Sequence, residues 1–141
     1  MEDEVMSVIK SQRGLSEMEF LNNARKLEIY TIRRCVNTIP KRYTFYLGQH
    51  LADAATQIYA NTKKANSIYP TNAREVQIRR EFFLKAYVEC QNLVSQIEVA
   101  YELIHFETKV LEEWSELIAT QINLIKGAMT KDRKRFQKFL K

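Results

Sequence analysis

Hydrophobic side chains recur along most of this chain in alternating steps of three and four residues, the spacing that lines up one face of an α-helix. The clearest example lies in residues 47–68, where the seam consists of Leu47, Leu51, Ala54, Ile58, Asn61, Ala65 and Ile68. A second seam runs in phase from Phe83 to Ala128. Steps of this kind, sustained over so many turns, predict an all-α protein built from packed helices.

Local signals divide the pattern into separate helices. Ser16 followed by Glu19 matches a capping box, in which both side chains satisfy free backbone donors at a helix N-terminus. Pro40 ends the first helix and is expected in the first turn of the second, where its missing N–H is not needed. Pro70 ends the second helix, and Asn72 is expected to cap the third.

The second seam does not show where the third helix ends. A single helix from Asn72 to Gly127 would be about 80 Å long at 1.5 Å per residue, and half of its apolar face would have no partner. We therefore expect a tight hairpin within residues 105–109, with Thr108 as the cap of a fourth helix.

The resulting prediction is an antiparallel, up-down-up-down four-helix bundle over residues 16–130, with a flexible leader at 1–15 and a basic tail at 131–141. The small number of glycines (3) and prolines (2) among 141 residues supports one helical domain. The sequence shows no secretory signal and no apolar run of membrane-spanning length, so we expect a cytoplasmic protein that does not enter a membrane. Cys35 and Cys90 each fall in a helical apolar pattern and are expected to be buried, reduced thiols.

The net charge of +5 is concentrated near the C-terminus, where residues 126–141 contain seven bases and one acid, Asp132. The bundle topology predicts that both of its ends are basic. One end would hold Arg33, Arg34, Lys41 and Arg42, and the other Lys63, Lys64, Arg74, Arg79, Arg80 and the C-terminal segment. Dense bases attract phosphates at long range, so RNA or DNA is a candidate partner.

Aromatic residues accompany both groups of bases. Beside the first are Tyr43, Phe45 and Tyr46, which could stack on unpaired nucleotides or could simply plug the end of the bundle. In the C-terminal segment Phe136, Phe139 and Leu140 would share one side of a helix. That segment could therefore bind a partner protein or a membrane surface instead.

Candidate catalytic chemistry is sparse. Glu102 and His105 have the Glu-x-x-His spacing of carboxylate-bridged di-iron bundles, but the other histidine, His50, has Leu47 where a glutamate would be required. His105 is expected near the hairpin, and His50 on the surface of the second helix or at a subunit contact. No glycine-flanked nucleophile or phosphate-cradling glycine loop occurs. The sequence therefore predicts a protein that is not an enzyme and has no metal site or cofactor.

Several spaced motifs resemble a known family. They are Ile39-Pro40-Lys41-Arg42-Tyr43, Leu47-Gly48-Gln49 with Ala54, Ala65-Asn66 with Tyr69-Pro70, the segment from Arg79 to Ala86, and Leu124-Ile125-Lys126-Gly127. The combination resembles the four-helix bundle proteins related to the 23S ribosomal RNA intervening-sequence proteins. Within that group it most resembles the accessory variability determinants of diversity-generating retroelements. The resemblance covers about residues 16–130 and rests on short motifs without a catalytic signature.

The resemblance implies a ring-like homopentamer of four-helix bundles, without catalytic activity, that binds reverse transcriptase and RNA or DNA during mutagenic retrohoming. The bases that match the family are Lys41, Arg42, Arg79, Arg80 and Lys126. Charge alone adds the remaining candidates for nucleic-acid binding, which are Arg33, Arg34, Lys131, Arg133, Lys134 and Arg135. The alternative left open is a protein-interaction module of the intervening-sequence family with an unknown partner.

Overall fold

The computed structural model describes residues 15–140, with side chains from Glu19 onward. Its helical elements, in chain order, are α2 (Leu15–Asn37), the 3-10 turn η1 (Lys41–Tyr43), the π-helical turn η2 (Thr44–Gly48), α3 (Gln49–Ser67), α4 (Ala73–Leu103), α5 (Thr108–Arg135) and the 3-10 turn η3 (Gln137–Phe139). The four long helices form an all-α bundle, as the hydrophobic pattern predicts. The first 14 residues of the predicted leader, and the Ser16 side chain of the predicted capping box, lie outside the described part.

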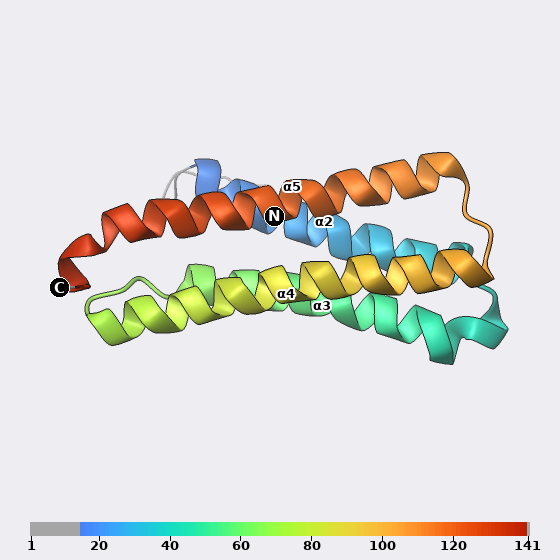
Figure 1. Ribbon diagram of the computed structural model, residues 1–141, viewed down its shortest axis with the longest axis horizontal. Helices are drawn as coiled ribbons and strands as arrows, with labels where there is room; N and C mark the ends of the chain where they lie inside the picture. Colours follow the sequence, from blue (N-terminus) through green and yellow to red (C-terminus); the bar gives the residue numbers. More distant parts are fainter. Residues whose placement is uncertain (1–14, 141) are drawn as a thin grey trace, which may run out of the picture.

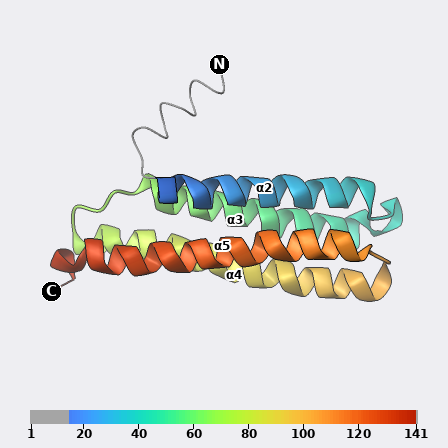
Figure 2. The same ribbon diagram turned by 90° about the horizontal axis from the view of Figure 1, so that it is seen from above.

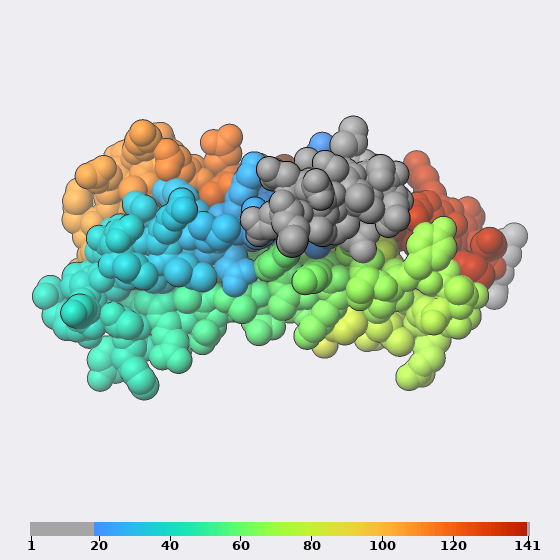
Figure 3. Space-filling model, turned by 180° about the vertical axis from the view of Figure 1, so that it is seen from behind, coloured from blue at the N-terminus to red at the C-terminus, as the bar shows by residue number. Residues whose placement is uncertain are grey.

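The four long helices lie side by side along the long axis of the molecule (Figures 1 and 2). Helices α3 and α5 each pack against both α2 and α4. In Figure 1 the chain runs in one direction in α2 and α4 and returns in α3 and α5. The α2–α3 and α4–α5 connections therefore share one end of the bundle, and the α3–α4 connection shares the other with the end of α5 (Figure 3).

The predicted seams form the core. The buried apolar residues of these seams include Leu47, Leu51, Ala54, Ile58, Ala65, Phe83, Ala86, Cys90, Leu93, Ala100, Trp114, Ile118 and Ile125. Trp114 is fully buried, and its indole Nε1 donates a hydrogen bond of 2.9 Å to Oγ1 of buried Thr31 in α2. Because this bond satisfies both polar groups, a hydroxyl and an indole N–H are accommodated between otherwise apolar layers.

The α3–α4 connection follows the predicted capping chemistry. Ile68 and the two residues after it leave the helical conformation before Pro70, which lacks a backbone donor. Asn72 is the N-cap of α4, and its side chain accepts a 3.0 Å hydrogen bond from the backbone N–H of Glu75. The start of α4 is therefore where the sequence predicts it.

The α4–α5 connection confirms the predicted hairpin. Helix α4 ends at Leu103 and α5 begins at Thr108, so the seam that looks continuous in the sequence is broken at residues 104–107. Thr108 is not the cap, however. Glu107 occupies the N-cap position and makes no capping hydrogen bond with its side chain.

The α2–α3 connection differs from the prediction. Pro40 is the N-cap of η1 and has the extended ψ angle of 145°, so it precedes the helical turns and does not lie within them. The chain then passes through the π-helical turn η2 before α3 begins at Gln49. Phe45 and Tyr46 lie in this turn with 75% and 72% of their surface exposed, so they do not plug the bundle.

The C-terminal segment is part of the bundle and not a separate tail. Helix α5 continues through residues 131–135, and η3 follows it. Asp132 and Phe136 are buried. Within residues 15–140, no helix combines the length and apolar character needed to span a bilayer.

Candidate nucleic-acid interface

The end of the bundle where α3 ends, α4 begins and α5 ends gathers bases from three helices. We call this end, with its flanks, the basic pole. Its exposed or half-buried bases are Lys63, Lys64, Arg74, Arg80, Lys126, Lys131, Arg133, Lys134, Arg135 and Lys138. Figure 3 shows the α3–α4 connection and the C-terminal residues together at this end. The fold thus places six of the predicted phosphate-binding residues at or near one end of the bundle: Arg80, Lys126, Lys131, Arg133, Lys134 and Arg135.

Arg79 is not part of that surface. Its side chain is 6% exposed, and its Nε and Nη2 donate to the two carboxylate oxygens of Asp132 at 2.6 and 3.2 Å. Its Nη1 donates to the carbonyl oxygens of Ala65 and Ile68 at 3.1 and 3.0 Å. A buried guanidinium with its donors used in this way cannot reach a phosphate in solvent. The prediction that Arg79 contacts nucleic acid is therefore wrong. Arg79 instead links the start of α4 to the ends of α3 and α5.

Two acids near the basic pole, Asp132 and Glu75, are held by local partners. Asp132 is buried against Arg79. Glu75 accepts hydrogen bonds from the hydroxyl and backbone N–H of Thr71, and these bonds hold the pKa of its carboxyl below the ordinary value. Between described residues, the salt bridges are Arg79–Asp132 and Lys109–Glu113. Exposed bases such as Lys131 and Lys134 therefore remain open to an external anion.

The opposite end, which we call the corner pole, carries mixed charge. Its predicted binding residues are Arg33, Arg34, Lys41 and Arg42. The Arg34 guanidinium lies 5.2 Å from the ring centre of Tyr30, and its Nε is buried. The hairpin brings residues 98–116, with six acids and one base, to this same end. The expectation that both ends are basic is therefore wrong, because it did not place the acidic ends of α4 and α5 beside these bases.

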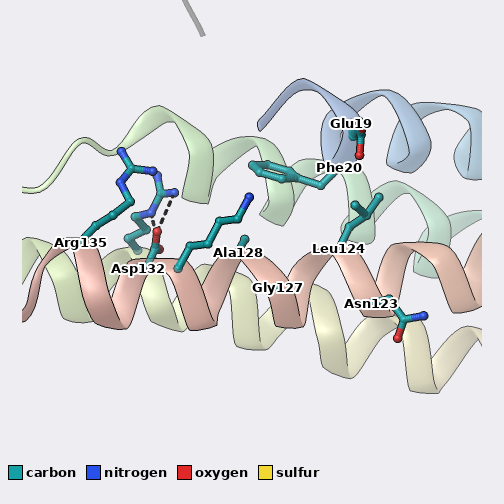
Figure 4. A pocket seen from close by; sticks show the side chains of 10 residues that line it. Glu19, Phe20, Asn123, Leu124, Gly127, Ala128, Asp132 and Arg135 are labelled. Carbon is teal, nitrogen blue, oxygen red and sulfur yellow. Dashed lines mark hydrogen bonds and ion pairs between the residues drawn. The ribbon is translucent and has the colours of Figure 1, made fainter. Parts of the chain in front are cut away.

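Two pockets flank the Arg79–Asp132 pair. The first, of about 190 Å³, has apolar lining from Phe20, Leu124 and Ala128 and charged lining that includes Lys131 and Arg135. Figure 4 looks into it and shows Phe20 on α2 opposite residues of α5, with dashed lines marking the contacts of Asp132. The second, of about 230 Å³, is lined by Val76, Gln77, Arg80, Met129, Asp132, Arg133 and Leu140. Each pocket combines apolar side chains with charged ones, which include Asp132 as well as bases.

The groups considered for metal or thiol chemistry are separate from the basic pole. His105 lies in the α4–α5 hairpin and His50 is exposed near the start of α3, as expected. Cys35 and Cys90 are free thiols, and burial raises their pKa values to about 11 and about 12. Both therefore stay protonated and unreactive near neutral pH. Within residues 15–140, no group of three or more His, Cys, Asp or Glu side chains is arranged to hold a metal ion.

Two features of the basic pole were not predicted from the sequence, the Arg79–Asp132 pair and the exposed ring of Tyr69. A signal for the pair was present. Arg79 lies four residues before Phe83, and Asp132 lies seven after Ile125, so both are in phase with the core seams. An arginine and an aspartate at seam positions of neighbouring helices could have been predicted to pair inside the bundle.

Comparisons with known proteins identify no relative: no family model matches the chain, and neither a curated protein nor a solved structure does. The class of protein is therefore defined by the structure itself, as a four-helix bundle with one strongly basic end.

Proposed function

We propose that this protein is a non-enzymatic scaffold that binds RNA or DNA through the phosphate backbone at its basic pole. The observation that carries the proposal is the number of exposed bases from α3, α4 and α5 on that pole. The buried Arg79–Asp132 pair takes one base and one acid out of the surface, so the excess of exposed bases at this end is unchanged. Contacts of this kind hold a nucleic acid and set its orientation without reading its sequence.

The test compares charge reversal at the two ends. Lys131→Glu with Lys134→Glu changes two exposed residues of the basic pole, and each lost phosphate contact costs about 1 kcal/mol in solvent. We expect the double variant to weaken RNA binding at least about tenfold. Binding is measured by fluorescence anisotropy of a labelled single-stranded RNA at low salt.

The matched control is Lys41→Glu with Arg42→Glu, which makes the same change of charge at exposed positions of the corner pole. The sequence predicts a severalfold loss of RNA affinity for this variant. Because the corner pole carries mixed charge, we expect that loss to be smaller than the loss for Lys131→Glu with Lys134→Glu. Circular dichroism should show both variants as helical as the wild type. An equal or greater loss from the corner variant would move the interface to the other end of the molecule.

The resemblance to accessory variability determinants supports a more specific proposal. In that proposal the chain forms a homopentamer and presents nucleic acid to the reverse transcriptase of a diversity-generating retroelement. Surface beyond the needs of one bundle supports self-association: Ile29 and Ile32 on α2 are 40% and 42% exposed, and Val36 is 74% exposed. Light scattering on the full chain tests the pentamer.

A second candidate is a protein-interaction module, favoured by the exposed Phe45 and Tyr46 of turn η2. Their ring centres are 6.1 Å apart and the rings meet edge to face, so two exposed aromatic side chains lie together on the corner pole. Exposed aromatic residues of this kind are common anchors of protein interfaces. The RNA titration distinguishes the candidates, since a module of this kind predicts no RNA binding by the wild type.

A further inference from the structure

The tip of the basic pole carries a cluster of aromatic rings and cations, which we call the aromatic tip. It consists of Tyr69 from the α3–α4 connection, Phe136 and Phe139 from the end of the chain, and the bases Arg135 and Lys138. The rings of Tyr69 and Phe136 meet edge to face, with centres 6.1 Å apart and planes at 89°. Phe139 stacks beside Phe136 at 6.4 Å.

Tyr69 is the exposed member of this cluster. Its surface is 74% exposed, whereas Phe136 beneath it is 4% exposed. The Arg135 guanidinium carbon lies 5.9 Å from the centre of the Tyr69 ring, and the ammonium nitrogen of Lys138 lies 5.0 Å from that of Phe139. The Tyr69 ring is thus exposed to solvent, packs against the buried Phe136 ring and lies close to cations.

The backbone on both sides of Tyr69 is held in place. The carbonyl oxygen of Ile68 accepts a hydrogen bond from Nη1 of buried Arg79 at 3.0 Å. On the other side Pro70 is buried, and the backbone N–H of Thr71 donates to Oε1 of Glu75 at 2.8 Å. The ring is therefore carried by an anchored loop, so a ligand that stacks on it need not first order the chain.

We propose that Tyr69 is a stacking platform for an unpaired nucleobase, so that the basic pole prefers single-stranded RNA or DNA to a duplex. The inference rests on the proposed phosphate binding and adds the kind of strand that is bound. The pole bases hold the phosphates on either side while the base lies against the ring. Stacking on an aromatic side chain contributes about 1–3 kcal/mol per base. Bases in a duplex are already stacked on one another and cannot use the ring.

The test is Tyr69→Ala, assayed with a labelled adenine-rich single strand and with a duplex of the same length. We expect single-strand binding to weaken about fivefold or more, with duplex binding within twofold of the wild type. Tyr46→Ala is the matched control: Tyr46 is 72% exposed at the corner pole, and its loss should change neither titration. The thermal midpoint of each variant shows whether it is folded.

Two further substitutions separate stacking from simple apolar contact. Tyr69→Phe keeps the π-face and should retain single-strand binding. Tyr69→Leu keeps apolar bulk without a π-face and should behave as Tyr69→Ala does. If Tyr69→Leu retains single-strand binding, or if Tyr69→Ala weakens binding to the single strand and to the duplex equally, Tyr69 is not a stacking platform.

The outcomes also separate this inference from the proposed function. Wild-type protein that binds neither strand nor duplex would refute both. Wild-type protein that binds both equally, with no effect of Tyr69→Ala, would refute only the platform. Loss of binding to phosphatidylserine vesicles in Tyr69→Ala, with unchanged single-strand binding, would assign the aromatic tip to a membrane surface and overturn the inference.

Discussion

Replacing Asp132 with alanine is expected to lower the free energy of unfolding by about 3–5 kcal/mol, because it leaves a buried arginine without its counter-charge. Asp132 accepts two hydrogen bonds from Arg79, and the side chains are 12% and 6% exposed. The loss is a large part of the 5–15 kcal/mol typical of a single domain. Urea unfolding followed by circular dichroism measures it.

The control for this prediction removes both charges. Arg79→Met with Asp132→Leu replaces the pair with apolar groups, and such replacements of buried pairs are often neutral or stabilising. We expect the double variant to recover most of the stability lost in Asp132→Ala. If Asp132→Ala unfolds at the same urea concentration as the wild type, then the pair does not hold the ends of α4 and α5 together.

Replacing Trp114 with alanine should destabilise the bundle by about 3–5 kcal/mol, through lost burial and the cavity that remains. Trp114 is fully buried, and its ring meets those of Phe106 and Tyr30 at 6.0 and 6.1 Å. It therefore fastens α5 to α2 and to the α4–α5 hairpin. Thermal unfolding followed at the helical circular dichroism band is the measurement.

A pair of smaller changes isolates the hydrogen bond from the packing. Trp114→Phe keeps an aromatic ring but leaves the buried Thr31 hydroxyl without its donor, at a cost of about 1–3 kcal/mol. Adding Thr31→Val removes that hydroxyl and should restore part of the loss. Equal stability of Trp114→Ala and Trp114→Phe would show that ring packing at this position contributes little.

The path of the helices could be predicted from the sequence because burial is periodic. The seam of α3, the Asn72 cap and the hairpin near residue 105 all follow from spacing and local side-chain chemistry. The π-helical turn η2 could not be predicted, since no side chain in it specifies a π-helical turn over an α-helical one. The path of the chain after residue 130 was also missed, because a charge count does not show that Asp132 and Phe136 face inward.

The candidate site was predicted only in outline for a related reason. A count of bases assumes that every arginine is exposed. This assumption is wrong for Arg79, which is buried because it falls on a core seam. The mixed charge of the corner pole could have been predicted, because the predicted hairpin already brings the acid-rich residues 98–116 to the end that holds the bases of that pole. Residue type alone does not give exposure: the seam position of Trp114 predicted its burial, whereas no seam contains Tyr69 and its exposure could not be predicted.

Phosphate contacts at the basic pole require that the affinity for nucleic acid fall as salt rises, so a salt titration is the decisive test of the claim that this pole binds nucleic acid. For the wild type with single-stranded RNA, we expect the logarithm of the association constant to fall linearly with the logarithm of salt concentration. The slope should be about −3 or steeper, which corresponds to at least four phosphates at about 0.7 per contact. Lys131→Glu with Lys134→Glu should make that slope shallower. Binding that is absent at low salt, or that does not change with salt, would contradict the claim.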